Sequence, residues 1–164
     1  MRTLLPHRGI FLESWDGAVQ CAEDVVGLID EGRDLTTSAG TFARRALVIE
    51  DEALLAEFVA EILEEFGFAV TSAASAESAL SCAREHIAAF EFAILDLGLP
   101  DRPGEEVAAE LRKLRPDFPI IVATGRSDDE TRQRFQNFGE IVFLMKPYSV
   151  DHLNNAVNAI TQRA

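Results

Sequence analysis

The sequence has little positive charge. Of its 164 residues, 15 are Lys or Arg and 28 are Asp or Glu, which gives a formal net charge of −13. This balance repels phosphate backbones and anionic membrane surfaces, and therefore disfavours nucleic acids and membranes as partners. It favours cations and basic proteins instead.

Long hydrophobic runs are also missing. The longest apolar stretches have about five residues, whereas a membrane-spanning helix needs about 20. Near the N-terminus, Pro6 and His7 interrupt the apolar residues, so we expect no signal peptide. The two cysteines, Cys21 and Cys82, lack metal-binding spacing and cannot build a disulfide framework, so we expect a cytoplasmic setting.

What the sequence does contain is a regular alternation of short apolar runs and amphipathic stretches after residue 40. The preceding stretch 34–40 (DLTTSAG) has the composition of a linker and predicts an N-terminal extension over 1–40 and a domain over 41–164. Continuous apolar runs are typical of parallel strands that are covered on both faces. The five predicted strands are Ala46–Ile49, the weaker Ala69–Ala73, Phe90–Leu95, Ile120–Ala123 and Ile141–Met145.

The stretches between these runs have helical spacing. Ranges 52–66, 104–115 and 149–163 predict amphipathic helices, Ser75 is placed to begin another, and a polar helix is expected near 128–138. Five strand-then-helix repeats predict an α/β fold with a doubly wound, five-stranded parallel sheet. The predicted core positions of the three amphipathic helices are Leu55, Phe58, Val59, Ile62, Leu63 and Phe66, then Val107, Leu111 and Leu114, then Val150, Leu153, Val157 and Ile160.

The N-terminal extension has a weaker helical pattern. A helix over 14–32 would begin at Ser14, end at Gly32 and place Trp15 on an apolar stripe. Two interpretations remain open. The segment is either an arm that packs on the domain or mediates self-association as a homodimer, or a loosely ordered extension.

Chemically versatile side chains follow the predicted strands. In an open parallel sheet the carboxyl ends of the strands meet at one rim, where ligands bind. Three carboxylates, one hydroxyl and one ammonium should therefore come together there. They belong to Glu50 and Asp51 after the first strand, Asp96 after the third, Thr124 after the fourth, and Lys146, which precedes Pro147, after the fifth.

Clustered carboxylates repel one another unless a cation neutralises them, and oxygen ligands of this kind suit Mg²⁺. Lys146, one of only two lysines in the chain, could bind one phosphoryl oxygen and Thr124 another. Asp96 could then act as a nucleophile. Taken alone, the acids after the first strand could simply favour a helix N-terminus, and Asp96 could be a turn residue. Their combination in this order favours the chemical interpretation.

These residues carry a resemblance to the receiver domain of bacterial two-component response regulators. The segments LVIEDE, ILDLGLPDRPGEE, IVATG and FLMKPY resemble that family's acidic pair, phosphoacceptor strand, hydroxyl-bearing strand and Lys-Pro strand end. The resemblance extends over residues 45–163 and implies the flavodoxin-like (βα)5 fold. PIIVATG is also partly similar to the PFxFATG motif of a subgroup of single-domain receivers.

The resemblance implies roles for individual residues. Asp96 would accept a phosphoryl group from a histidine kinase or a histidine phosphotransfer protein. Mg²⁺ would be held by Glu50, Asp51, Asp96 and the backbone carbonyl of Gly98. Thr124 and Lys146 would contact the phosphoryl group, and Phe143 occupies the aromatic switch position. Phe143 stands where Tyr is commoner, and an ordinary core aromatic remains the alternative for it.

We therefore expect a stand-alone bacterial response regulator whose output is a change in protein–protein contacts. Its chemistry would be limited to self-catalysed phosphoryl acceptance and hydrolysis at Asp96. Alternatives are a phosphoryl shuttle in a phosphorelay and a degenerate receiver that acts as a fixed adaptor. A phosphohydrolase with an aspartate nucleophile is disfavoured, because Gly98 stands where such enzymes of the haloacid-dehalogenase type have a second Asp.

Overall fold

The computed structural model describes residues 44–125, 129–139 and 141–162. The helix expected over 14–32 and Cys21 lie outside these residues. Within them, strands and helices alternate from Arg44 onward, as predicted. The elements are β1 (Arg44–Ile49), α1 (Ala53–Glu65), β2 (Phe68–Ala73), α2 (Ala76–His86), the short 3₁₀ helix η1 (Ile87–Ala89), β3 (Phe92–Asp96), α3 (Gly104–Leu114), β4 (Ile120–Thr124), α4 (Asp129–Arg134), β5 (Ile141–Met145) and α5 (Val150–Thr161).

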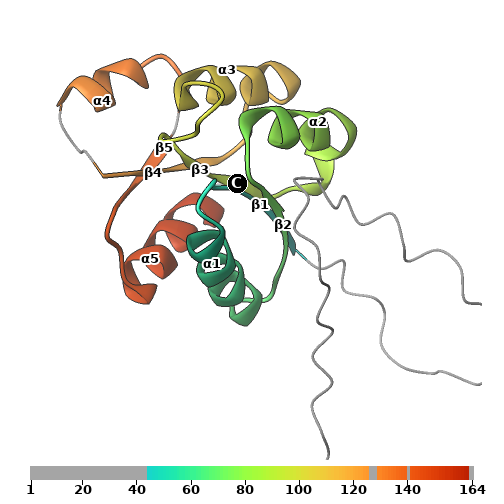
Figure 1. Cartoon of the computed structure of the whole chain (residues 1–164), viewed down its shortest axis with the longest axis vertical. Helices are drawn as coiled ribbons and strands as arrows, with labels where there is room; N and C mark the ends of the chain where they lie inside the picture. Colours follow the sequence, from blue (N-terminus) through green and yellow to red (C-terminus); the bar gives the residue numbers. More distant parts are fainter. Residues whose placement is uncertain (1–43, 126–128, 140, 163–164) are drawn as a thin grey trace, which may run out of the picture.

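The five strands form one parallel sheet in the order β2-β1-β3-β4-β5, which confirms the doubly wound arrangement. Figure 1 shows α1 and α5 on one face of the sheet and α2, α3 and α4 on the other. The strand order reverses direction between β1 and β3. In open sheets of this kind, ligands bind outside the carboxyl ends of the strands at such a point, so functional residues are expected there.

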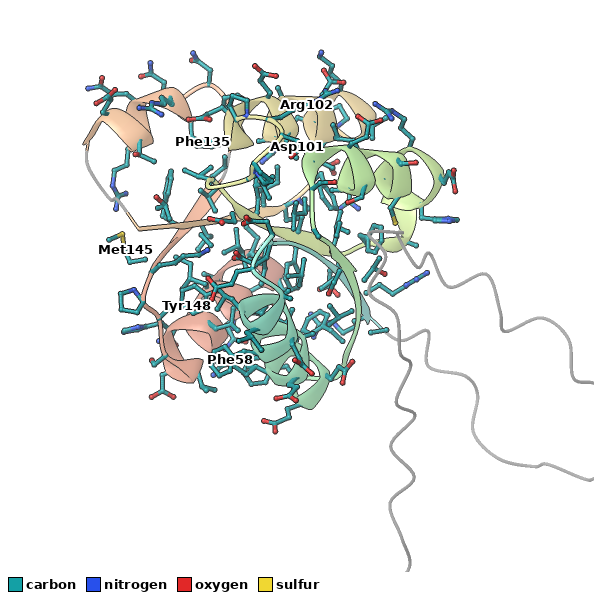
Figure 2. The ribbon with its side chains drawn as sticks, in the orientation of Figure 1. Phe58, Asp101, Arg102, Phe135, Met145 and Tyr148 are labelled. Atoms are coloured by element: carbon teal, nitrogen blue, oxygen red, sulfur yellow. The ribbon has the colours of Figure 1, made fainter. Side chains whose placement is uncertain are left out.

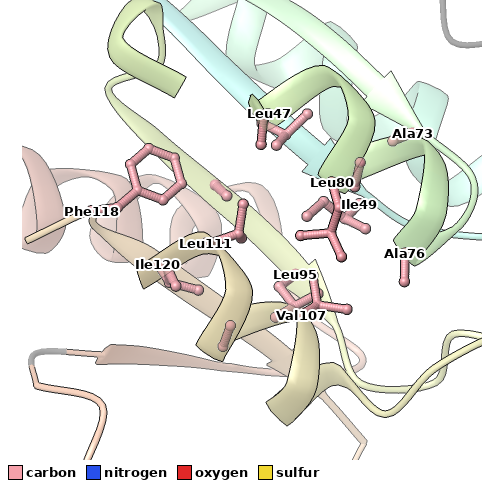
Figure 3. Packing of buried hydrophobic residues seen from close by; sticks show 14 of the residues in the cluster. Leu47, Ile49, Ala73, Ala76, Leu80, Leu95, Val107, Leu111, Phe118 and Ile120 are labelled. Atoms are coloured by element: carbon pink, nitrogen blue, oxygen red, sulfur yellow. The ribbon is translucent and has the colours of Figure 1, made fainter. Parts of the chain in front are cut away.

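Two apolar clusters hold the helices to the sheet. The first lies between the sheet and the pair α2 and α3, with Leu47, Leu95 and Leu111 at its centre (Figure 3). The second lies under α1 and α5, where the rings of Phe68 and Phe92 meet edge to face at 5.1 Å. All residues of β3 and β4 are buried, as expected for central strands covered on both faces. Burying each large apolar side chain stabilises the fold by about 1.5–3 kcal/mol.

The structure confirms three helix ends that the sequence predicted: the end of α1 and the starts of α2 and α5. Gly67 follows α1 with a φ of +86°, a conformation that glycine adopts without strain. The side chain of Ser75 begins α2 by accepting a hydrogen bond from the backbone N–H of Ser78 at 3.2 Å. Ser149 begins α5 in the same way.

Several details of the sequence-based prediction were wrong. Phe58, Leu114 and Val150, assigned to apolar stripes, have exposed fractions of 40%, 40% and 44%. Leu114 is the last residue of α3 and Val150 the first of α5, so both lie at helix ends, whereas Phe58 lies within α1, at the margin of its apolar stripe. α4 is shorter than the range 128–138, and β3 begins at Phe92 because η1 occupies the preceding turn. None of the helices in the described part of the chain is both long and apolar enough to cross a membrane.

Candidate functional site

The sheet brings the side chains singled out in the sequence to one rim. Asp96 is the last residue of β3 and Thr124 the last of β4, while Glu50 and Lys146 directly follow β1 and β5. Backbone hydrogen bonds fix these strand ends, for example from Lys146 N–H to the carbonyl of Thr124 at 2.8 Å. The sequence-based placement of all these residues is therefore confirmed.

Three carboxylates form the centre of the site. Glu50, Asp51 and Asp96 each place a carboxylate oxygen within 4.8 Å of the others. Glu50 and Asp96 are buried, with exposed fractions of 5% and 8%, whereas Asp51 is exposed. This set of hard oxygen donors, partly open to solvent, fits Mg²⁺, which is bound by a few carboxylates and keeps several waters.

Lys146 closes the other side of the cluster. Its Nζ donates a hydrogen bond to Glu50 Oε2 at 2.7 Å and lies 3.1 Å from Asp96 Oδ1. One ammonium therefore partly neutralises two buried carboxylates, which would otherwise be left as uncompensated charges. A partial excess of negative charge remains, as a cation site requires.

Proton affinities in the cluster reflect this crowding. Burial raises the pKa of Glu50. The hydrogen bond from Lys146 lowers this pKa, whereas the negative charge of Asp96 raises it further, and the net effect is a raised pKa. Burial lowers the pKa of Lys146, but its contacts with Glu50 and Asp96 outweigh that effect and leave the pKa above its ordinary value. Lys146 therefore stays charged at neutral pH and can serve as a fixed positive group for an anionic ligand.

Gly98 lies directly against the central carboxylate. A Cβ atom at position 98 would come within 3.1 Å of Asp96 Oδ2, tighter than ordinary van der Waals contact. The loop after β3 can therefore pass close to Asp96 because it lacks a side chain here. This short distance is compatible with the role that the resemblance implies for Gly98, whose backbone carbonyl would be a Mg²⁺ ligand.

Phe143 on β5 contacts α4. Its ring lies 5.9 Å from the ring of Phe135, edge to face, and the Arg132 guanidinium lies 5.2 Å from its centre. Phe143 is half-buried, while Thr124 at the end of the neighbouring strand is buried. Phe143 therefore packs against the first apolar cluster and against Arg132 of α4 in this structure.

Two residues near the site were not found from the sequence. Tyr148 has a buried hydroxyl with no hydrogen-bond partner among the described residues, and burial, then the charges of Glu50 and Asp96, raise its pKa above its usual range. Asp101, in the loop after β3, hydrogen-bonds the start of α2. No sequence signal marks Asp101, because its partners lie 25 and 24 residues away along the chain.

Comparison with known proteins supports the same interpretation. The response regulator receiver domain family model matches residues 46–158. The two-component response regulator PhoP of Pseudomonas aeruginosa is 32% identical over 120 residues, which are 73% of this chain and 52% of PhoP. The transcriptional regulatory protein PdtaR of Mycobacterium tuberculosis is 31% identical over 129 residues, which are 78% of this chain and 62% of PdtaR. The chain thus spans only part of the length of these relatives.

Solved structures show the same fold. A CheY-like response regulator receiver domain protein from Methanospirillum hungatei is 28% identical and superimposes with a TM-score of 0.68, covering 73% of this chain and 94% of that one. A response regulator protein from Burkholderia pseudomallei is 32% identical with a TM-score of 0.62, covering 74% of this chain and 73% of that one. With its five-stranded sheet and its acidic rim, this chain belongs to the family of response regulator receiver domains, which accept phosphoryl groups.

Proposed function

We propose that this chain accepts a phosphoryl group on Asp96 in a Mg²⁺-dependent reaction, with a histidine kinase or a histidine phosphotransfer protein as the donor. The observation that carries the proposal is the position of Asp96, within 4.8 Å of two other carboxylates and 3.1 Å from Lys146. The similar response regulator from Burkholderia pseudomallei was solved with a phosphorylated aspartic acid and a calcium ion.

The proposed transfer is a displacement at phosphorus. A carboxylate oxygen of Asp96 forms a bond to phosphorus while the phosphorus–nitrogen bond of the donor phosphohistidine breaks, and the electron pair leaves with the imidazole nitrogen. Glu50, Asp51, Asp96 and the carbonyl of Gly98 would hold Mg²⁺, which when bound supplies positive charge to the phosphoryl oxygens. Lys146 supplies a second positive charge on the opposite side, where negative charge develops.

The output we propose is a changed protein-binding surface around α4 and β5. A phosphoryl group on Asp96 attracts the hydroxyl of Thr124 through a charge-assisted hydrogen bond. Movement of Thr124 makes room for Phe143 to turn inward, away from Phe135. Burying a phenyl ring is worth about 1.5–3 kcal/mol, which biases a two-state surface, while an almost complete switch needs about 5.5 kcal/mol. Contacts of the phosphoryl group with Lys146 and the metal supply the rest.

The phosphoacceptor is tested by incubating the protein with acetyl phosphate and Mg²⁺ and measuring its intact mass. The wild-type protein should gain one phosphoryl group, and Asp96→Asn should gain none. Asp117→Asn is the matched control, because its carboxylate is exposed and forms an ion pair with Arg115 at 3.4 Å. An undiminished adduct on Asp96→Asn would contradict the assignment.

We also propose that residues 41–164 form the receiver unit and residues 1–40 an extension outside it. All five strands and their helices begin at or after Arg44. The fragment 41–164 should therefore fold and become phosphorylated at the rate of the full chain. A fragment that aggregates, or that folds without accepting a phosphoryl group, would place the extension within the receiver unit.

A further inference from the structure

The loop that follows the phosphoacceptor is joined to a helix far away in the sequence. Asp101 lies in the loop between β3 and α3, beside the start of α2 (Figure 2). Its two carboxylate oxygens accept separate hydrogen bonds from the backbone N–H groups of Ala76 and Glu77, both at 3.0 Å. Next to it, Arg102 forms an ion pair with Glu77 at 3.2 Å.

α2 does not depend on Asp101 for a cap of its own. The Ser75 side chain accepts the hydrogen bond from Ser78 N–H at 3.2 Å, and the Ser75 carbonyl accepts that from Ala79 N–H at 3.0 Å. Asp101 accepts hydrogen bonds from the N–H groups of Ala76 and Glu77, to which the Ser75 side chain does not bond. Its negative charge lies at the positive end of the helix dipole. Asp101 is therefore an additional cap that comes from another segment, and it connects the loop between β3 and α3 to the start of α2.

The other end of this loop is also fixed. Leu99 is buried against the first apolar cluster. Gly104, at the start of α3, packs so closely that a Cβ there would come within 3.1 Å of the Cα atom of Leu97. The short segment between Leu97 and Asp101, which carries Gly98 past the Asp96 carboxylate, is thus held at both ends.

We infer that Asp101 is a positioning residue of the phosphoacceptor site, because its two hydrogen bonds to α2 hold the loop that places Gly98 against Asp96. This inference rests on the proposed function, in which the Gly98 carbonyl is a Mg²⁺ ligand. Partial desolvation raises the pKa of Asp101, but the hydrogen bonds from Ala76 and Glu77 outweigh it and lower the pKa below its ordinary value. The carboxylate is therefore charged at neutral pH and able to accept both hydrogen bonds.

The test uses Asp101→Asn, which keeps the size of the side chain but turns an amide N–H₂ toward one of the two backbone N–H groups. Two variants serve as controls. Ser75→Ala removes the helix's own cap and leaves the loop contact. Glu77→Gln removes one negative charge beside Asp101, and with it the ion pair to Arg102, while keeping both backbone hydrogen bonds. Ser75→Ala thus controls for loss of helix stability, and Glu77→Gln for loss of charge.

The first measurement is amide hydrogen exchange by NMR in metal-free protein. Asp101→Asn should speed exchange at the amides of residues 97–99 at least several-fold relative to wild type and to both controls, because the loop loses one of its two hydrogen bonds to α2. Unchanged exchange at these amides in Asp101→Asn would overturn the inference, whatever the protein does with metal.

The second measurement is Mg²⁺ affinity by calorimetric titration. Asp101→Asn should raise the Kd about three- to tenfold, less than the 10–100-fold typical of residues that contact a metal ligand directly. At saturating Mg²⁺ its rate of phosphorylation by acetyl phosphate should return to the wild-type value. An equal rise in Kd for Ser75→Ala or Glu77→Gln, or no rise for Asp101→Asn, would overturn the inference. Faster exchange in a protein whose wild-type form binds no Mg²⁺ would instead refute the proposed function and leave the anchoring role in place.

Discussion

Asp51→Asn distinguishes a metal site from a helix-capping role by the sign of its effect on stability. The Asp51 carboxylate lies within 4.8 Å of those of Glu50 and Asp96. If the three acids form a cation site, they repel one another in metal-free protein, and removing one charge stabilises the fold. If Asp51 only favours the start of α1, removing its charge destabilises the fold.

The expected magnitude follows from the geometry. A like-charge pair at 4.8 Å costs about 0.9 kcal/mol in a water-like dielectric and about 3.5 kcal/mol at a dielectric constant of 20. Asp51 is exposed, so the lower value applies to each of its two pairs, and Lys146 offsets part of it. A charge near a helix N-terminus is worth about 0.3–1 kcal/mol in the opposite direction. The net prediction is a gain of about 0.5–1 kcal/mol in the free energy of unfolding without metal.

The measurement is urea unfolding of wild-type protein and Asp51→Asn, each with EDTA and with excess Mg²⁺. Mg²⁺ at a concentration 100-fold above its Kd should stabilise the wild-type protein by about 2.7 kcal/mol, and the variant by little or nothing. The order of stability should therefore reverse when the metal is added. A variant that is less stable than wild type in EDTA and responds normally to Mg²⁺ would refute the metal site and favour the capping role.

Three further outcomes are expected. Thr124→Ala should still be phosphorylated but should lose the amide shifts over α4 and β5 that beryllofluoride induces in the wild-type NMR spectrum; a full wild-type shift pattern would refute the proposed coupling. Gly104→Ala should lower the free energy of unfolding by about 1–3 kcal/mol, because a Cβ there meets Leu97, while Gly125→Ala, which has open space, should have little effect in urea unfolding. Because the folded-state pKa of Asp101 is depressed, its carboxylate stabilises the fold above its unfolded pKa of about 3.9 and loses this contribution as the pH falls through the folded-state value. The stability difference between wild type and Asp101→Asn should therefore shrink below about pH 4 in acid titrations, and a constant difference would contradict this.

The fold was predictable because its strands are buried on both faces and appear in the sequence as uninterrupted apolar runs. The rim of the site was predictable for a related reason: once the strands were placed, Asp96, Thr124 and Lys146 had to meet at their carboxyl ends. Both predictions depend on local patterns joined by a single topological rule.

What could not be predicted depends on contacts between segments that share no local pattern. Asp101 looks like any polar loop residue, and only the folded chain brings it to the first turn of α2. The exposure of Phe58 likewise depends on how far α1 rotates on the sheet, which apolar spacing alone does not determine. In both cases the outcome was set by tertiary packing and not by local sequence.

The site residues come from almost the whole length of the described chain. Lys146 binds Glu50, 96 positions earlier in the sequence, and it follows β5, the last strand of the described residues. The centre of the sheet also forms late in synthesis, because β1 can pair with β3 only after residue 92 has been added to the chain. A nascent, truncated or nicked chain without β5 would have carboxylates but no ammonium opposite them. Under the proposed function, such a chain would accept phosphoryl groups more slowly, because it lacks the positive charge that Lys146 places 3.1 Å from Asp96.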